Sequence, residues 1–263
     1  MQENKKFKLV TSKKTRYLLP NILTLAGVCL GISSIKFSID GNFTLAVTLI
    51  LLAAILDALD GRIARLIKGT SEFGKELDSL TDFVSFGIAP VFILYFWELN
   101  NYGKLGWAIT LIYSVCCVLR LARFNLTKIE ETESWKNNFF EGIPSPAGGL
   151  LILMPLIYEL TNLNIGFDVK SITPYLTILI AILLVSKIPT LALKKISISS
   201  KATVFLLLGI GIVFIALLFY TLETLLIFGI VYLMTIPVSI ILYYNQNKKS
   251  VDEISEDNHE DIL

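Results

Sequence analysis

Residues 43–66 read FTLAVTLILLAAILDALDGRIARL, and this stretch decides the fold class of the chain. Its first fourteen positions, 43–56, carry no charged side chain. A helix crosses the hydrocarbon core of a bilayer with about 20 predominantly apolar residues. The stretch therefore predicts a transmembrane helix, Phe43–Leu66, whose polar end carries Asp57 and Asp60.

The composition of the whole chain agrees with this prediction. Of 263 residues, 54% are hydrophobic and 17% charged, and the mean hydropathy is +0.68; soluble domains carry about 25% charged residues. A net charge of +1 argues against a nucleic-acid-binding protein, which normally shows a basic face. Cys29, Cys116 and Cys117 have no metal-site spacing, and the one histidine is His259, which argues against a disulfide framework, a zinc site or a histidine-based triad.

Eight apolar runs long enough to approach the thickness of a bilayer follow one another along the chain. They predict an all-α, polytopic bundle of about eight transmembrane spans. Because the first run is short and the last two are joined by very little, six or seven spans remain alternatives. The predicted spans are Pro20–Ile35, Phe43–Leu66, Lys75–Trp97, Leu105–Phe124, Ser145–Leu160, Ser171–Pro189, Ala202–Tyr220 and Leu222–Tyr244.

The basic residues indicate how these spans are oriented. If eight helices alternate from a cytoplasmic N-terminus, 20 of the 23 Lys and Arg residues fall on the cytoplasmic side, as the positive-inside rule requires. Residues 1–19 then form a basic cytoplasmic arm, with no cleavable signal peptide evident. Residues 245–263 are expected to form an acidic, disordered cytoplasmic tail.

Four carboxylates gather in the segment 57–82, DALDGRIARLIKGTSEFGKELDSLTD. Asp57 and Asp60 are three positions apart at the end of one predicted helix, and Asp78 and Asp82 are four apart at the start of the next, so each pair shares a helix face. The short link makes the two helices antiparallel neighbours. All four carboxylates are therefore expected to converge just inside the cytoplasmic boundary, where charged groups are usually functional.

Converging carboxylates stay ionised together only when a cation neutralises them. Oxygen ligands suit Mg²⁺ or Mn²⁺, and two such ions can clamp the attacking and leaving oxygens of a phosphoryl transfer. Gly61 and Gly74 leave room for a bulky ligand, and Arg65 adds a phosphate-binding cation. The alternative interpretation is that the aspartates cap helices and pair with nearby basic side chains.

The pattern D-x2-D-G-x2-A-R-x8-G-x3-D-x3-D, complete here from Asp57 to Asp82, resembles the signature of the CDP-alcohol phosphotransferase family. The resemblance covers the first six spans. It implies a six-helix core over residues 20–200, with residues 201–244 as two additional transmembrane helices of unassigned role. It also implies a homodimer.

The family's reaction implies a role for each matching position. A CDP-linked lipid gives its phosphatidyl group to an alcohol and releases CMP. By resemblance, Asp82 acts as the general base and also contacts metal. The implied metal ligands are Asp57, Asp60, Asp78 and Asp82. The implied CDP-diacylglycerol-binding residues are Asn21, Gly61, Ala64, Arg65 and Gly74.

Three further segments resemble the phosphatidylserine synthase branch of that family: RLARFN at 120–125, GIPSPAGG at 142–149 and DSLTDFVSFGIAP at 78–90. Two arginines near one turn apart can grip the carboxylate of L-serine. The same arginines can also be ordinary positive-inside anchors, and the prolines a simple helix start. The expected serine-binding residues are Arg120, Arg123, Asn125, Pro144 and Ser145.

The resemblance thus predicts a membrane enzyme that uses CDP-diacylglycerol and L-serine, set in a prokaryotic cytoplasmic membrane with its active site on the cytoplasmic side. The nearest alternative is another acceptor, such as glycerol 3-phosphate in a phosphatidylglycerophosphate synthase. A remote alternative is a cation transporter, which predicts carboxylates near the bilayer midplane and inverted repeats. No such repeat is evident.

Overall fold

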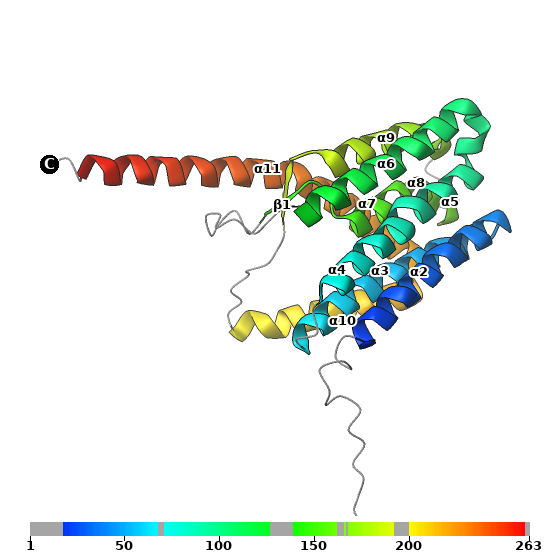
Figure 1. The fold of residues 1–263 in the computed structure, drawn as a ribbon, viewed down its shortest axis with the longest axis horizontal. Helices are drawn as coiled ribbons and strands as arrows, with labels where there is room; N and C mark the ends of the chain where they lie inside the picture. Colours follow the sequence, from blue (N-terminus) through cyan, green and yellow to red (C-terminus); the bar gives the residue numbers. More distant parts are fainter. Residues whose placement is uncertain are drawn as a thin grey trace, which may run out of the picture.

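The computed structural model of the chain describes residues 18–67, 71–126, 139–161, 166, 168–191 and 200–260. Within these ranges the protein is a bundle of helices with one short pair of strands (Figure 1). Helix α2 packs along the length of α3, and α6 packs along α9. The predicted all-α architecture is confirmed.

Five helices of the described ranges are long and apolar enough to cross a membrane. They are α2 (Leu18–Ile39), α3 (Phe43–Leu66), the continuous helix formed by α4 (Glu72–Asp82), η1 (Phe83–Ile88) and α5 (Ala89–Trp97), α6 (Lys104–Leu126), and the first part of α11 (Thr221–Glu260). Two further helices, α9 (Val169–Val185) and α10 (Ser200–Phe219), have apolar parts that are shorter than those of the five long helices. The protein is an integral membrane protein, and the count of eight spans stays a prediction.

The fifth predicted span is divided in two in the structure. Helix α7 (Ser145–Ile152) ends at Leu153, and α8 (Met154–Leu160) begins immediately after it. Pro155 lies in the first turn of α8. Because proline has no N–H and its ring clashes with the carbonyl four residues earlier, it interrupts a helix there.

Capping side chains begin the two helices that carry the carboxylates. The side chain of Asn42 accepts a hydrogen bond from the Leu45 amide at 3.2 Å and starts α3. The hydroxyl of Ser71 accepts one from the Gly74 amide at 3.0 Å and starts α4. Each cap satisfies an amide that the first turn of a helix leaves without a partner.

A π-helical segment, η1, follows directly after Asp82. Pro90 lies just beyond it and has no N–H to give to the carbonyl of Phe86 one turn earlier. The hydroxyl of Tyr113 on α6 donates to that carbonyl at 3.0 Å. The irregular turn is therefore satisfied by a neighbouring helix, as non-helical backbone at membrane depth must be.

Small residues let α2 approach this irregular turn closely. A Cβ atom added at Gly31 would lie 2.9 Å from the hydroxyl oxygen of Ser85. That hydroxyl donates to the carbonyl of Gly27 at 3.2 Å. The contact fixes α2 against the helix that carries Asp78 and Asp82.

The C-terminal part of the chain contains α10, α11 and the second strand of a two-stranded sheet. Strands β1 (Phe139–Glu141) and β2 (Pro189–Leu191) pair antiparallel, and α11 packs against β2 and α8. Helix α11 continues to Glu260 and projects beyond the rest of the bundle (Figure 1). A disordered tail was expected at 245–263; over 245–260 the structure has a helix instead, since no glycine or proline follows Pro237 to interrupt it, and 261–263 lie outside the described residues.

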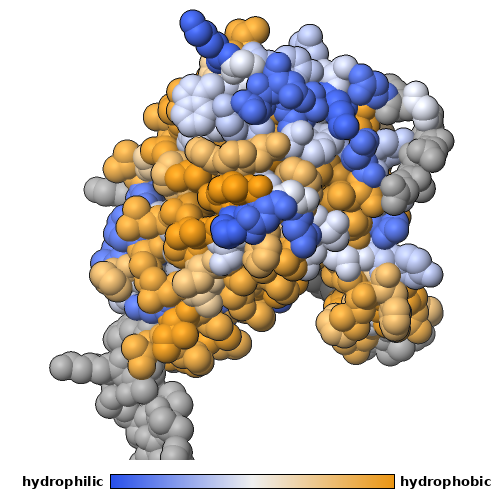
Figure 2. Space-filling model, turned by 90° about the vertical axis from the view of Figure 1, so that its right-hand side faces the viewer, coloured by the Kyte–Doolittle hydropathy of each residue, from blue (hydrophilic) through white to orange (hydrophobic). Residues whose placement is uncertain are grey.

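The face of the molecule shown in Figure 2 is broadly hydrophobic, with separate patches of hydrophilic residues. Large apolar side chains are exposed on several helices, among them Phe205 at 77% and Phe219 at 76% on α10. A soluble monomer rarely exposes so much contiguous apolar surface. This surface is the one expected where helices face lipid.

Of the described glycines, Gly106 has the least room for a side chain. A Cβ added there would lie 1.8 Å from the carbonyl oxygen of Leu99. Gly106→Ala is therefore expected to destabilise the protein by about 3 kcal/mol, measured as a lower midpoint of thermal denaturation in detergent. Gly209→Ala is the matched control, because no heavy atom of the described residues would lie within 4 Å of its Cβ. Equal midpoints for the two variants would contradict the contact.

Candidate active site

Three carboxylates meet where the end of α3 faces the start of α4. Asp57, Asp60 and Asp78 each place one oxygen so that all three atoms lie within 4.8 Å of one another. Asp60 is buried, with 3% of its surface exposed, and the other two are half-buried. Three of the four carboxylates that were predicted to converge therefore do so in the structure.

A hydroxyl from α2 fixes one of these carboxylates. Thr24 is buried and donates to Oδ2 of Asp60 at 2.7 Å, while its hydroxyl also lies 3.0 Å from the carbonyl of Pro20. The sequence offered no local signal for this contact, because the two residues are 36 positions apart. Such hydrogen bonds orient carboxylates that bind metals.

Asp82 lies at the junction of α4 and η1, next to the three-carboxylate group. Its carboxyl is within hydrogen-bonding reach of the Asp57 carboxyl, and its Oδ1 atom is buried without a hydrogen-bond partner. A buried carboxylate oxygen of this kind is costly unless a ligand or cation satisfies it. Asp82 therefore faces the same site as the other three.

The residues expected at the CDP moiety lie around the same helix ends. A Cβ added at Gly74 would lie 3.3 Å from Oδ1 of Asn21, so the glycine favours the close approach of α2 and α4 there. Gly61 has open space beside it, and Arg65 is exposed with its Nε donating to the Gly61 carbonyl at 3.0 Å. Ala64 is half-buried on the same helix.

Arg120 connects the carboxylates to the start of α7. One terminal nitrogen of its guanidinium donates to the buried hydroxyl of Ser145, and Pro144 is the residue before that helix. Arg120 also interacts electrostatically with Asp82. The structure therefore brings Arg120 and Ser145 together beside the acidic group.

Arg123 and Asn125 both form hydrogen bonds within the protein. The two terminal nitrogens of Arg123 donate to the carbonyls of Val185 at 2.8 Å and Ser186 at 3.1 Å, at the C-terminus of α9. A cation is favoured there by the partial negative charge of the helix end. Arg123 thus ties α6 to α9, and its expected part in serine binding stays a prediction.

The side chain of Asn125 exchanges hydrogen bonds with the hydroxyl of Ser79, at 3.0 and 3.2 Å. Ser79 lies on α4, one position after Asp78. Asn125 therefore reaches the edge of the acidic site through Ser79, a residue that the spacing of the carboxylates did not single out.

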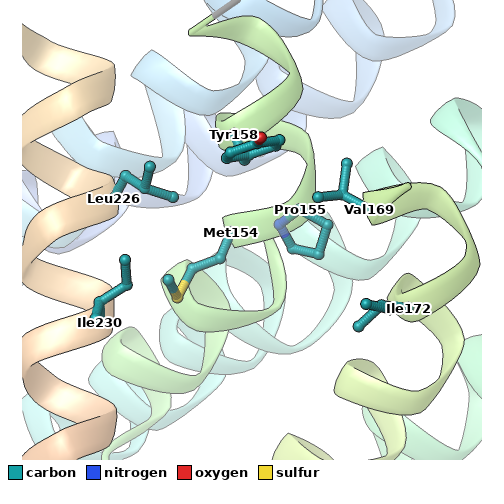
Figure 3. Close-up of a pocket in the computed structure, with 7 residues that line it drawn as sticks. All are labelled: Met154, Pro155, Tyr158, Val169, Ile172, Leu226 and Ile230. Atoms are coloured by element: carbon teal, nitrogen blue, oxygen red, sulfur yellow. The ribbon is translucent and has the colours of Figure 1, made fainter. Parts of the chain in front are cut away.

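A separate cavity of about 400 Å³ lies between α8, the start of α9 and α11 (Figure 3). Its lining is almost wholly apolar and contains none of the four aspartates. Apart from Tyr158, the lining has no side chain that can activate a hydroxyl or hold a phosphate. The lining residues are Met154, Pro155, Tyr158, Val169, Ile172, Leu226 and Ile230.

The fold and site define a helical integral membrane enzyme with a carboxylate centre at the ends of two adjacent helices. The model of the CDP-alcohol phosphatidyltransferase family matches residues 17–185. The chain belongs to this family. The match includes α2 to α9 and ends before α10 and α11.

Curated relatives of the chain carry one name, CDP-diacylglycerol–serine O-phosphatidyltransferase. The protein from Helicobacter pylori is 33% identical over 241 residues, which cover 89% of this chain and 98% of that protein. The protein from Bacillus subtilis is 34% identical over 149 residues, covering 56% of this chain and 81% of that protein. The protein from Methanocaldococcus jannaschii is 39% identical over 142 residues, covering 54% and 61% respectively.

Proposed function

We propose that the protein transfers the phosphatidyl group of CDP-diacylglycerol to the hydroxyl of L-serine, giving phosphatidylserine and CMP. The observation that carries this proposal is the meeting of Asp57, Asp60, Asp78 and Asp82 beside Arg120. The names of the relatives from Helicobacter and Bacillus support the same donor and acceptor.

The acidic group fits a divalent metal centre. Three carboxylate oxygens within 4.8 Å of one another repel unless a cation joins them, and oxygen donors are the ligands that Mg²⁺ and Mn²⁺ prefer. We assign Asp57, Asp60 and Asp78, with Asp82 at their edge, as the residues that hold two such ions. When bound, these ions neutralise charge on the donor's diphosphate.

The donor's cytidine diphosphate is assigned to the helix ends around the metal centre. The open space beside Gly61 leaves room there for a nucleotide, Asn21 lies close to Gly74 at the neighbouring helix ends, and the exposed Arg65 supplies positive charge. The acyl chains then extend into lipid. In this position the phosphorus atom of the phosphatidyl group faces the part of the site that contains Arg120 and Ser145.

Asp82 is assigned as the general base. Its carboxylate takes the proton of the serine hydroxyl as the serine oxygen bonds to the phosphorus of the phosphatidyl group. The bond from that phosphorus to the oxygen of the CMP phosphate breaks, and CMP leaves. The reaction needs no covalent intermediate on the protein.

Arg120 and Ser145 are assigned to the acceptor, with Pro144 positioning Ser145 at the start of α7. Asn125 is assigned to the edge of the acceptor site, where it bonds Ser79, and Arg123 holds α6 against α9. The basic residues of the sequence favour a cytoplasmic site and cytoplasmic termini, in a prokaryotic inner membrane. The homodimer also stays a prediction.

The proposed reaction is tested by measuring CMP release from purified protein in mixed micelles of CDP-diacylglycerol with Mg²⁺ or Mn²⁺. L-serine, sn-glycerol 3-phosphate and inositol phosphate are added in turn. We expect release with L-serine. CMP release with a phosphorylated acceptor and none with L-serine would contradict the proposed acceptor and assign the protein to another branch of the family.

Thr24 offers a test of how Asp60 is oriented. Thr24→Val removes the hydroxyl that donates to Asp60 at 2.7 Å while keeping the volume of the side chain. Loss of such a supporting hydrogen bond lowers metal affinity about tenfold, so the Mg²⁺ concentration for half-maximal CMP release is expected to rise by that factor. Thr48→Val is the control, since the Thr48 hydroxyl bonds only a backbone carbonyl of its own helix among the contacts described. Identical Mg²⁺ curves for both variants would contradict this role.

A further inference from the structure

Three polar atoms near the acidic site are buried without a hydrogen-bond partner. Across the described residues, four buried side-chain polar atoms lack one, and three of these are Oδ1 of Asp82, Nε of Arg120 and the hydroxyl of Tyr232. The fourth belongs to Ser38, near the end of α2. Unpaired buried polar atoms are rare, because each loses its bonds to water.

These three groups follow one another in space from α4 to α11. Asp82 interacts electrostatically with Arg120, and Arg120 with Tyr232. Tyr232 is held beside Thr190 because α11 packs against β2, while the Thr190 hydroxyl itself donates to the carbonyl of Gly142 at 2.7 Å. Helix α11 thus brings a tyrosine hydroxyl near Arg120, which in turn lies near Asp82.

We propose that Tyr232 binds the acceptor: its hydroxyl and Nε of Arg120 donate hydrogen bonds to the carboxylate of L-serine, whose hydroxyl faces Asp82. The inference rests on the proposed function. Nε of Arg120 and the Tyr232 hydroxyl are donors, which a carboxylate accepts, and Oδ1 of Asp82 is an acceptor, which suits a hydroxyl. The carboxylate of Asp82 therefore suits the hydroxyl end of serine, and the two donors on Arg120 and Tyr232 suit its carboxylate end.

This assignment gives α11 a part in the site. The family match ends at residue 185, so the family core does not include Tyr232. Any contribution of this residue to acceptor binding is an addition to that core. Tyr232 is accordingly a binding residue for the acceptor and takes no part in proton transfer.

The test is Tyr232→Phe in the full-length protein, which removes only the hydroxyl. A hydrogen bond to a charged group is lost, so the KM for L-serine is expected to rise about tenfold or more, while kcat and the KM for CDP-diacylglycerol stay near wild type. Tyr244→Phe is the matched control, since Tyr244 lies on the same helix and is 65% exposed. Its kinetic constants are expected to match wild type.

The outcomes separate this inference from the proposed function. If the wild-type protein releases no CMP with L-serine, the proposed function fails. If it does, and Tyr232→Phe has an unchanged serine KM or raises both KM values equally, only the role of Tyr232 fails. Among the described residues no hydrogen bond of ordinary geometry holds this hydroxyl, so the variant should also keep its thermal stability. A lower unfolding midpoint would therefore overturn the inference as well.

Discussion

Asp82→Asn is expected to lower serine-dependent CMP release by about a thousandfold, which is within the usual contribution of a general base. Asparagine has the same shape but cannot accept the serine proton. The carboxyl of Asp82 lies beside that of Asp57, so removal of its charge also relieves repulsion. The variant is therefore expected to fold. Because Asp57, Asp60 and Asp78 remain to bind metal, CDP and Mg²⁺ should still stabilise it in a thermal-shift measurement.

The control for this experiment is Asp40→Asn. Asp40 is paired with Lys36 near the opposite end of α2, and both side chains are well exposed. An exposed pair contributes about 0–1 kcal/mol, so activity and stability should both remain close to wild type. Near-normal turnover by Asp82→Asn would remove Asp82 from the role of base, whereas loss of CDP protection would make it a donor-binding residue.

The parts of the fold that depend on local sequence could be predicted. The boundaries of α3 follow from a continuous apolar run, because the length of such a run must match the bilayer. The meeting of Asp57 and Asp60 with Asp78 follows from helical periodicity and a short link. These features need no knowledge of other helices.

Contacts between distant segments left no comparable signal. Nothing in the spacing indicates that Thr24 bonds Asp60, or that Arg123 reaches the carbonyls at the end of α9. Both depend on how α2 and α9 pack, and hydroxyl and arginine residues occur in many other roles. The split between α7 and α8 is different. Pro155 in the sequence indicates a helix break, and the prediction of one continuous span over Ser145–Leu160 did not use it.

The same limit explains why α11 had no predicted role. Its sequence reads as an apolar span followed by a charged segment, and Tyr232 is one of ten tyrosines in the chain. Only the packing of α11 on β2 brings this residue near Arg120. A function carried by one hydroxyl in an apolar run becomes visible only in three dimensions.

Asp78→Asn is expected to abolish activity while making the metal-free protein more stable. The carboxylates of Asp57, Asp60 and Asp78 have oxygens within 4.8 Å of one another, so without a cation their repulsion opposes folding. Neutralising Asp78 relieves that repulsion and removes a ligand at the same time. In metal-free buffer, the unfolding midpoint of the variant should lie above that of wild type.

Addition of Mg²⁺ should reverse this order. A cation that binds only the folded state stabilises wild type by about 2.7 kcal/mol at one hundred times its Kd, whereas Asp78→Asn has lost the site and should show little response. The measurement is the unfolding midpoint of each protein in chelator and across a Mg²⁺ titration, with CMP release followed in parallel. A wild type that is insensitive to Mg²⁺, or a variant that responds as wild type does, would mean that the three carboxylates are not a metal centre. The opposite signs in chelator and in Mg²⁺ distinguish a lost ligand from a general loss of structure, because a misfolded variant would be less stable under both conditions.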